Sequence, residues 1–291
     1  MLRDFESGDG SARPCYQEIN MQMSYPQTVK VTLNFAADRN DGGEFSNSRP
    51  ERSRQRLLPT EVEVRNARLW SRKPTLDLEG LTVAHHCAGR RDWTHSDWIQ
   101  SEYVPTCIEL VKTLTGARSA IHVFVPLQRR ADYGKVAGSA PTAGFVHIDQ
   151  TRDTCGQMIR HYTRGADFKR AAIYNVWKPI TPPPQDRPLA VSDRRSISLN
   201  DHVVGKTVEW LGEAEDEKLV SPYVTLAQSP DKPIWYYVPD MSLDESWVFI
   251  GVDLDPTQPL GCAHSAFHHP DMNGPLVPRA SIETRVLAIF E

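Results

Sequence analysis

Alternating hydrophobic and polar residues predict a strand near the start of the chain. Over residues 28–35 the hydrophobic positions are Val29, Val31, Leu33 and Phe35. This spacing is typical of a strand with one buried face. The stretches on either side, residues 1–27 and 38–56, are polar and charged. We therefore expect the ordered fold to begin at this strand and both flanking stretches to be poorly ordered.

Residues 96–115 show the spacing of an amphipathic helix. Hydrophobic residues recur three and four positions apart, at Val104, Cys107, Ile108, Val111 and Leu114. Ser96 or Asp97 is suited to cap the first turn, and Gly116 is suited to end the helix. Pro105 can divide the segment into two shorter helices, because proline cannot donate the backbone hydrogen bond of a helix interior.

From residue 120 onward the chain consists of short β-like runs separated by proline, glycine and aspartate. The predicted strands span residues 121–125, 144–149, 171–177, 235–238, 247–252 and 281–290. Strands at this density, without long helices between them, are typical of an antiparallel sandwich or barrel. We expect a mainly β (α+β) fold with one structural domain. Its parts are an N-terminal extension with supporting helices and strands (1–118), partly disordered, and a β-rich core (119–291).

The last predicted strand has two different faces. Ile282, Thr284, Val286, Ala288 and Phe290 share one face, while the other carries Glu283, Arg285, Leu287 and Ile289. Charge at one end and hydrophobic residues at the other are expected for a strand that enters a polar pocket.

A polar segment, residues 150–169, is predicted to cover the mouth of this pocket. It contains Arg152, Arg160 and Arg164 and only weak helical periodicity. The alternative is a solvated connector helix. As part of a lid, the three arginines are candidates for binding an anionic group of a substrate.

Composition excludes several classes of partner. The chain has 33 basic and 37 acidic residues, a net charge of −4 and no long basic run, which argues against nucleic-acid binding. No segment approaches the roughly 18–20 apolar residues that span a membrane. The five scattered cysteines form no CxxC pair, so a reducing, cytoplasmic location is expected. Residues 28–35, if they form an edge strand, could pair across a homodimer.

Two histidines and one aspartate are the candidate metal ligands. A His-x-Asp pair on a strand points both side chains to the same face. The pattern occurs three times, but His95-Ser96-Asp97 lies at the predicted helix start and His269-Pro270-Asp271 lies in a proline-rich loop. Only His147-Ile148-Asp149 is on a predicted strand. The alternative for this pair is a structural hydrogen bond.

A third ligand must come from a distant segment. His264, His268 and His269 are the choices, and His264 is preferred because it follows a short hydrophobic run. His268 and His269 are then loop residues or donors to the ligands. Two imidazoles and one carboxylate on one face form the ligand set of a non-haem iron(II) site with open positions.

A carboxylate cosubstrate of such a site would need a cation, and arginine offers two parallel donors. Arg279 and Ser281 lie two residues apart at the start of the last strand, and Arg285 lies on the same face as the alternative. Asn175 either binds the cosubstrate or satisfies backbone groups. Tyr237 either lines the pocket or packs in the core.

Several blocks in this order closely resemble the fungal hydroxylase/desaturase family, which includes gibberellin desaturases, the aspergillic acid hydroxylase and the cephamycin methoxylation proteins. The blocks are His147-x-Asp149, Asn175-Val176-Trp177-Lys178-Pro179, residues 188–193, residues 235–241, His264-Ser265-Ala266-Phe267 and residues 279–285. The resemblance begins near residue 93 and covers about two thirds of the chain.

The resemblance implies a double-stranded β-helix (jelly roll) that uses Fe(II), 2-oxoglutarate and O2. His147, Asp149 and His264 would be the iron ligands, and Arg279 and Ser281 would hold the distal carboxylate of 2-oxoglutarate. The expected reaction is hydroxylation, desaturation or oxidative cyclisation of a small natural-product intermediate, with release of succinate and CO2. Two alternatives remain from the residues alone. They are a cupin-like metalloenzyme that does not use 2-oxoglutarate and a non-catalytic β-sandwich binding protein.

Overall fold

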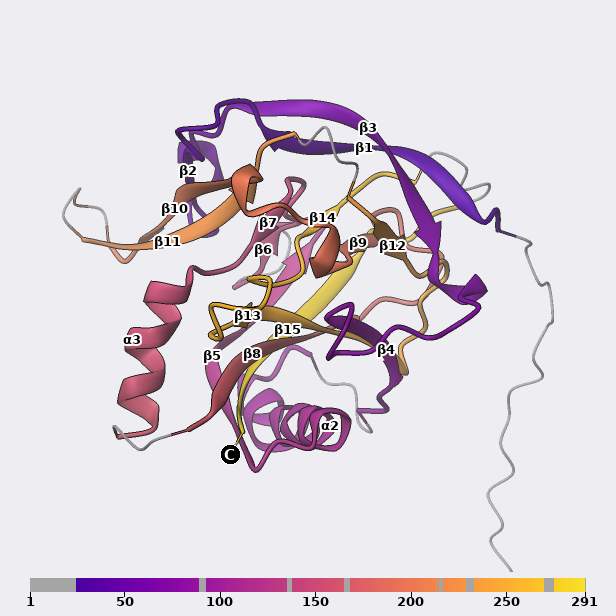
Figure 1. Cartoon of the computed structure of the whole chain (residues 1–291). Helices are drawn as coiled ribbons and strands as arrows, with labels where there is room; N and C mark the ends of the chain where they lie inside the picture. The colour runs from indigo at the N-terminus through magenta and orange to yellow at the C-terminus, as the bar shows by residue number, and fades with distance from the viewer. Residues whose placement is uncertain are drawn as a thin grey trace, which may run out of the picture.

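The computed structural model describes residues 25–290 except 89–92, 135–137, 165–167, 213, 215–216, 229–232 and 270–274. The described residues form two curled, mostly antiparallel sheets (Figure 1). The nine-stranded sheet has the order β1-β3-β12-β9-β14-β7-β11-β10-β2, and the six-stranded sheet has the order β4-β13-β8-β15-β5-β6. Residues 1–24, which belong to the N-terminal stretch predicted to be poorly ordered, lie outside the described residues.

The strands of the nine-stranded sheet are β1 (Thr28–Ala36), β2 (Glu44–Phe45), β3 (Leu57–Asn66), β7 (His147–Ile148), β9 (Leu189–Ser192), β10 (His202–Trp210), β11 (Lys218–Leu226), β12 (Trp235–Tyr237) and β14 (His264–Ala266). Those of the six-stranded sheet are β4 (Leu81–His85), β5 (Ser119–Arg130), β6 (Ala140–Pro141), β8 (Arg170–Pro179), β13 (Glu245–Asp253) and β15 (Ala280–Phe290). All six predicted strands from residue 120 onward are present, although β7 is shorter than predicted.

The helical segment predicted over residues 96–115 is present in three pieces. These are α1 (Ser96–Trp98), a π-helical turn (Ile99–Tyr103) and α2 (Val104–Thr115). Pro105 lies in the first turn of α2, where its missing N–H costs nothing, and Gly116 ends the helix with φ 65°. Two details were wrong. The N-cap is His95, without a side-chain cap bond, and Leu114 is 40% exposed rather than buried.

The core lies between the two sheets, and a second hydrophobic cluster fastens α2 to the outer face of the six-stranded sheet (Figure 1). Strand β15 separates the two clusters as its sequence predicts. Ile282, Val286 and Ala288 pack toward α2, whereas Leu287 and Ile289 pack between the sheets. The polar residues Glu283 and Arg285 therefore also face the space between the sheets.

The segment 38–56, predicted to be poorly ordered, is instead part of the fold. Strand β2 pairs with β10, and Pro50–Arg52 forms a 3-10 turn. The carboxylate of Glu209 on β10 accepts hydrogen bonds from the backbone N–H groups of Asn47 and Ser48. Polar partners on a neighbouring strand thus order a segment that has too few hydrophobic residues to predict it.

Strands β1, β3 and β4 also belong to the two sheets, so residues 28–85 are integrated with the rest of the fold. The division between 1–118 and 119–291 stays a prediction. Among the described residues, three further 3-10 turns, Ala67–Leu69, Arg194–Ser196 and Leu199–Asp201, and one further helix, α3 (Arg152–Tyr162), complete the regular structure. No helix among the described residues has the length and apolar character needed to cross a membrane.

Candidate metal centre and adjoining cavity

The three predicted metal ligands converge at the centre of the nine-stranded sheet. His147 on β7 lies directly opposite His264 on the antiparallel strand β14, and Asp149 follows β7 by one residue. One ligand atom from each of these side chains lies within 4.8 Å of the others. The two histidine Nε2 atoms are each 3.9 Å from a different carboxylate oxygen of Asp149.

Hydrogen bonds orient both imidazoles. His147 Nδ1 donates to the carbonyl of Phe145 at 2.9 Å, and His264 Nδ1 donates to the carbonyl of Cys262 at 3.3 Å. Because a carbonyl can only accept, each ring carries its hydrogen on Nδ1 and presents the Nε2 lone pair to the centre. Such an outer hydrogen bond is the usual way in which a protein fixes a metal-binding histidine.

The electrostatics favour neutral rings and an ionised carboxylate. Burial lowers the pKa of His147 to about 3, with the neighbouring His264 contributing, and burial likewise lowers the pKa of His264. Burial alone would raise the pKa of Asp149, but the positive charge of Arg285 outweighs it, with the hydrogen bond from Asn175 contributing, and that pKa is lowered. These are the protonation states that a metal ion requires of its ligands.

Two side chains from the opposite sheet hold Asp149. Asn175 Nδ2 on β8 donates to Oδ2 at 2.6 Å, and Arg285 Nη2 on β15 donates to Oδ1 at 2.9 Å. Arg285 also pairs with the buried carboxylate of Glu283. Asn175 and Arg285 are paired in the register of β8 and β15, so one rung of the six-stranded sheet supports the carboxylate.

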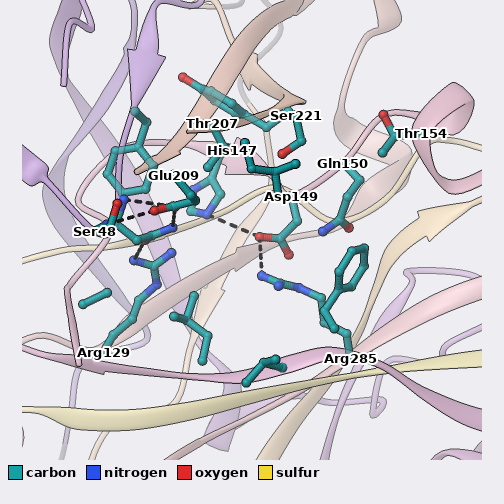
Figure 2. Close-up of a pocket in the computed structure, with 18 of the residues that line it drawn as sticks. Ser48, Arg129, His147, Asp149, Gln150, Thr154, Thr207, Glu209, Ser221 and Arg285 are labelled. Atoms are coloured by element: carbon teal, nitrogen blue, oxygen red, sulfur yellow. Dashed lines mark hydrogen bonds and ion pairs between the residues drawn. The ribbon is translucent and has the colours of Figure 1, made fainter. Parts of the chain in front are cut away.

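A cavity of about 630 Å³ opens beside the centre. His147, Asp149 and Arg285 line it, together with Arg129 and Glu209 (Figure 2). Hydrophobic residues form much of the remaining wall, namely Phe45, Phe124, Val125, Leu127, Phe145, Leu219 and Tyr223. Phe124 has a left-handed backbone, φ 62°, which is costly for a bulky residue and is typical of functional sites.

Arg279 and Ser281 face the space between the sheets but do not line this cavity, and both are about 1% exposed. Arg279 Nη1 donates to the carbonyl of Arg187 at 2.7 Å, while its buried Nε has no hydrogen-bond partner. Its guanidinium carbon lies 5.3 Å from the ring centre of Trp177. A buried arginine with a free donor is a suitable site for an anion.

The remaining candidates lie elsewhere. The Tyr237 hydroxyl contacts His269 Nε2 at 3.1 Å and its ring packs in the core. Arg160 and Arg164 are exposed on and after α3. Arg152 donates to the backbone carbonyls of Asp253 and Gln258. None of these four residues lines the cavity, and their predicted roles in binding stay predictions.

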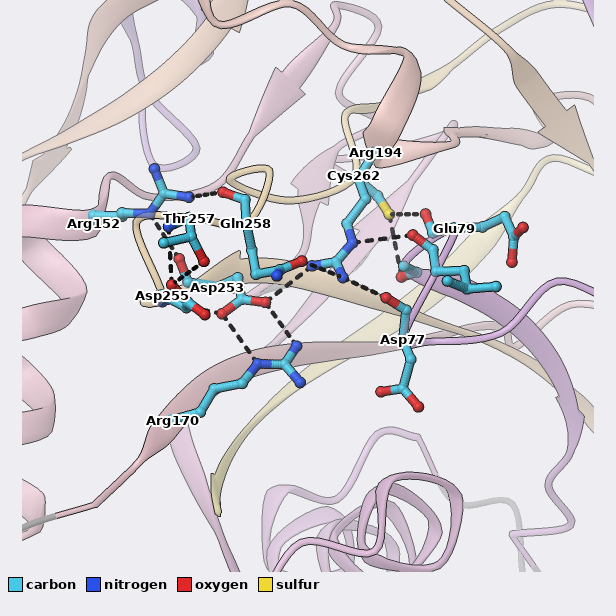
Figure 3. A network of polar contacts seen from close by, with 12 residues as sticks. Asp77, Glu79, Arg152, Arg170, Arg194, Asp253, Asp255, Thr257, Gln258 and Cys262 are labelled. Atoms are coloured by element: carbon cyan, nitrogen blue, oxygen red, sulfur yellow. Dashed lines mark hydrogen bonds and ion pairs between the residues drawn. The ribbon is translucent and has the colours of Figure 1, made fainter. Parts of the chain in front are cut away.

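Arg152 belongs to a buried polar network that fastens α3 to the six-stranded sheet (Figure 3). Its centre is Asp253, whose carboxylate pairs with Arg170 at 2.7 Å and Arg194 at 2.9 Å. Gln150 and Thr154, at the start of this segment, line the cavity. The prediction that residues 150–169 cover the mouth of the pocket stays a prediction, since only these two residues of the segment line the cavity.

The other His-x-Asp patterns do not join the centre. His95 is exposed and contacts Thr94, and His268 is exposed, whereas His269 is buried against Tyr237. Residues 270–274, which include Asp271, lie outside the described residues. The sequence analysis missed Arg129, Glu209 and Asn47 as cavity residues, because none of them belongs to a motif and Asn47 lies in the segment predicted to be poorly ordered.

Comparison with known proteins identifies the family. The chain matches the family model "Oxidoreductase/YMDC permease-like domain" over residues 33–289. The Fe(II)/2-oxoglutarate-dependent dioxygenase nvfI of Aspergillus novofumigatus is 30% identical over 194 residues, 65% of this chain and 66% of the relative. The alpha-ketoglutarate-dependent dioxygenase phiK of a fungal species is 27% identical over 277 residues, 90% of this chain and 96% of the relative. This chain belongs to the fungal Fe(II)/2-oxoglutarate-dependent dioxygenase family.

The fold of this dioxygenase-family chain agrees with solved structures. Two structures of the iron and alpha-ketoglutarate-dependent endoperoxidase NvfI have TM-scores of 0.74 and 0.71 at 22% and 23% identity. The two alignments cover 92% and 91% of this chain, and 99% and 98% of the respective solved chains. The predicted jelly-roll fold and the predicted class, an oxidoreductase of the dioxygenase type, are confirmed.

Proposed function

We propose that this protein is an Fe(II)/2-oxoglutarate-dependent oxygenase that acts on a small natural-product intermediate. His147, Asp149 and His264 would hold the iron. The observation that carries the proposal is the convergence of two Nε2 atoms and one carboxylate within 4.8 Å, in a chain of this family. Hydroxylation, desaturation and oxidative cyclisation all remain possible outcomes of the reaction.

The residues present fit the metal and the cosubstrate. Two neutral imidazoles and one carboxylate are the ligand set of non-haem iron(II) oxygenases. Both Nε2 atoms are oriented by hydrogen bonds on the far side of their rings. Arg279, with its unpartnered buried Nε, and the nearby hydroxyl of Ser281 fit the distal carboxylate of 2-oxoglutarate.

Iron(II) with 2-oxoglutarate and O2 would supply the oxidising chemistry that removes hydrogen from an unactivated carbon. The protein's own contribution is to hold the ligands and to limit access of water. Asn175 and Arg285 fix the Asp149 carboxylate from the opposite sheet. Phe145 and Phe249 pack beside the imidazoles, with ring centres 4.6 Å from His147 and 4.9 Å from His264. These hydrophobic rings exclude water from one side of each ligand.

The cavity supports a small-molecule substrate. Its volume of about 630 Å³ is in the range of ligand pockets, and its walls combine hydrophobic rings with a few charged groups. The hydroxylase/desaturase asaB of Aspergillus flavus is 33% identical over 130 residues, 42% of this chain and 56% of the relative. A natural-product intermediate is the substrate class that we propose.

Metal binding and succinate formation test this function. We expect purified protein to convert 2-oxoglutarate to succinate only with Fe(II) and to bind Mn(II) in calorimetry. His147→Ala, Asp149→Ala and His264→Ala should each lose metal binding and lower succinate formation at least about a hundredfold. His268→Ala is the matched control, since His268 is exposed and lies four residues after His264. Undiminished succinate formation in the Asp149→Ala variant would contradict the proposal.

Two further proposals concern the setting of the enzyme. The four described cysteines, Cys87, Cys107, Cys155 and Cys262, are free thiols, which supports a reducing, cytoplasmic location. Strand β1 is the last strand at one edge of its sheet, which supports pairing in a homodimer. Light scattering on purified protein measures the oligomeric state directly.

A further inference from the structure

Arg129 lies next to the residues expected to bind 2-oxoglutarate, although it is on a different strand. It is paired with Ser281 in the register of β5 and β15. Arg279 precedes Ser281 by two residues. Since residues opposite each other, and residues two apart, point to the same face of a sheet, Arg129, Ser281 and Arg279 all face the space between the sheets.

Neither guanidinium has a carboxylate partner among the described residues. Arg129 Nη1 donates to Asn47 Oδ1 at 2.7 Å and to the carbonyl of Pro141 at 3.0 Å. Arg279 Nη1 donates to the carbonyl of Arg187, and its Nε is buried without an acceptor. These neutral acceptors hold the side chains in place but do not neutralise their charges.

The third arginine of this face is different. Arg285 contacts the carboxylates of both Asp149 and Glu283, so its charge is already matched. Arg285 is a support for the metal ligand rather than a site for a further carboxylate.

The charge of Glu283 acts on both Arg129 and Arg279, but Glu283 forms its ion pair with Arg285. The two neighbouring buried cations are therefore only partly compensated, which is costly unless an anion joins them. The cost is visible at Arg279, where burial and the positive charge of Arg129 lower the pKa to about 9. Arg129 lines the same cavity as His147 and Asp149. One molecule can therefore contact the metal centre and the Arg129 guanidinium at once (Figure 2).

We propose that Arg129 and Arg279 together bind the distal carboxylate of 2-oxoglutarate, with Ser281 between them. The inference rests on the proposed function and adds a second cation, from β5, to the site. Each arginine can direct planar donors at the same carboxylate. Binding by two guanidinium groups is stronger and more selective than binding by one. Asn47, itself held by Glu209, positions the Arg129 guanidinium for this role.

The same chemistry could serve an acidic group on the substrate, so the experiment separates the two sources. The probes are 2-oxoglutarate and 2-oxobutanoate, which shares the keto acid but lacks the distal carboxylate. Binding of each is measured by calorimetry on the Mn(II)-loaded full-length protein. The variants are Arg129→Gln, Arg129→Lys and the matched control Arg130→Gln. Arg130 is the next residue of β5, lies on the other face and pairs with Asp132.

We expect Arg129→Gln to weaken 2-oxoglutarate binding roughly tenfold or more and to leave 2-oxobutanoate binding unchanged. Arg129→Lys should lose less, because the charge remains while the planar fork is lost. Arg130→Gln should bind both acids like the wild type. If Arg129→Gln does not fold, as judged by circular dichroism, Arg129→Lys carries the comparison. A loss confined to 2-oxoglutarate then supports the inference.

Wild-type affinity for 2-oxoglutarate in both Arg129 variants would overturn the inference and assign Arg129 to the substrate. Equal losses for the two keto acids would also overturn it, because the distal carboxylate would then not be the group recognised. Wild-type protein that binds neither acid in the presence of Mn(II) would overturn the proposed function itself. The two failures are therefore distinguishable.

Discussion

His147 and His264 face each other across neighbouring antiparallel strands, with their ring centres 4.3 Å apart. Each ring donates from Nδ1 to the carbonyl two residues earlier in its own chain. The register of β7 and β14 therefore sets the separation of the two ligands. A slip of one residue would turn one imidazole to the other face of the sheet and abolish the centre.

Asn175→Ala should weaken metal binding while the ligands themselves remain. The change removes the donor to Asp149 Oδ2 and leaves the carboxylate free to rotate. Loss of such an outer contact typically costs roughly 10–100-fold in metal affinity. Calorimetric titration with Mn(II) measures the effect, and Asn200→Ala, at an exposed site far along the chain, is the control. An unchanged affinity would show that Arg285 alone positions Asp149.

Arg285→Ala should destabilise the metal-free protein by about 3–5 kcal/mol, because two buried carboxylates lose their shared cation. Asp149 and Glu283 are both affected. Added Mn(II) should restore part of the lost stability, since the metal supplies positive charge at Asp149 and binds only the folded state. Urea unfolding with and without Mn(II) gives both values.

The matched control for that experiment is Arg56→Ala. Arg56 forms an exposed pair with Asp38 at 3.8 Å, with a side chain 79% exposed. Such surface pairs contribute about 0–1 kcal/mol. If Arg285→Ala and Arg56→Ala lose the same stability, Arg285 does not carry the charge compensation that its contacts indicate.

Asp253→Asn should destabilise the protein by about 3–5 kcal/mol, because it leaves two arginines without their carboxylate. Asp253 is fully buried, and its partner Arg194 is only 1% exposed. Urea unfolding measures the loss. Asp255→Asn is the control, because the Asp255 side chain accepts hydrogen bonds only from Thr257 in the described part of the chain, and the backbone N–H that it donates to Asp253 is unchanged by the substitution. A stability loss as small as the control's would mean that water can replace Asp253.

The sequence could predict those parts of the fold and site that depend on local pattern. The two faces of β15 follow from period-two alternation, and the split helix follows from Pro105 and Gly116. The three candidate ligands were identifiable because residue type, strand position and order along the chain all point to one chemistry. A short-range pattern carries the information for the strand faces, the helix and the His147-x-Asp149 pair, whereas His264 is selected by the order of the segments along the chain.

The cavity wall could not be predicted in the same way. Asn47 and Ser48 are ordered by the carboxylate of Glu209, a residue more than 160 positions away. Arg129 gains its meaning only from its register with Ser281. Both relationships arise from contacts between segments that are far apart in the sequence. Residues 38–56 show no alternation of hydrophobic and polar positions, and a single sequence does not show which strands pair.

His86 should make the stability of the metal-free protein depend on pH. Burial and the nearby charge of Lys178 lower its pKa from 6.5 to about 4. Its ring nitrogens contact Ser246 Oγ at 3.0 Å and Thr106 Oγ1 at 2.9 Å. The unfolded chain takes up a proton near its higher pKa, so this contribution to stability is complete above about pH 6.5 and is lost as the pH falls toward 4.

Wild-type protein should therefore lose about 2–3 kcal/mol more than His86→Gln between about pH 7 and about pH 4.5. Glutamine can still bond the two hydroxyls but does not titrate, so the variant removes only the pH-dependent part. Urea unfolding with a chelator present at both pH values measures the difference and keeps metal binding constant. The other buried histidines are common to both proteins and cancel in this comparison. Parallel pH profiles would mean that the folded protein takes up the His86 proton without cost, which the burial of this ring against Ser246 of β13 and Thr106 of α2 opposes.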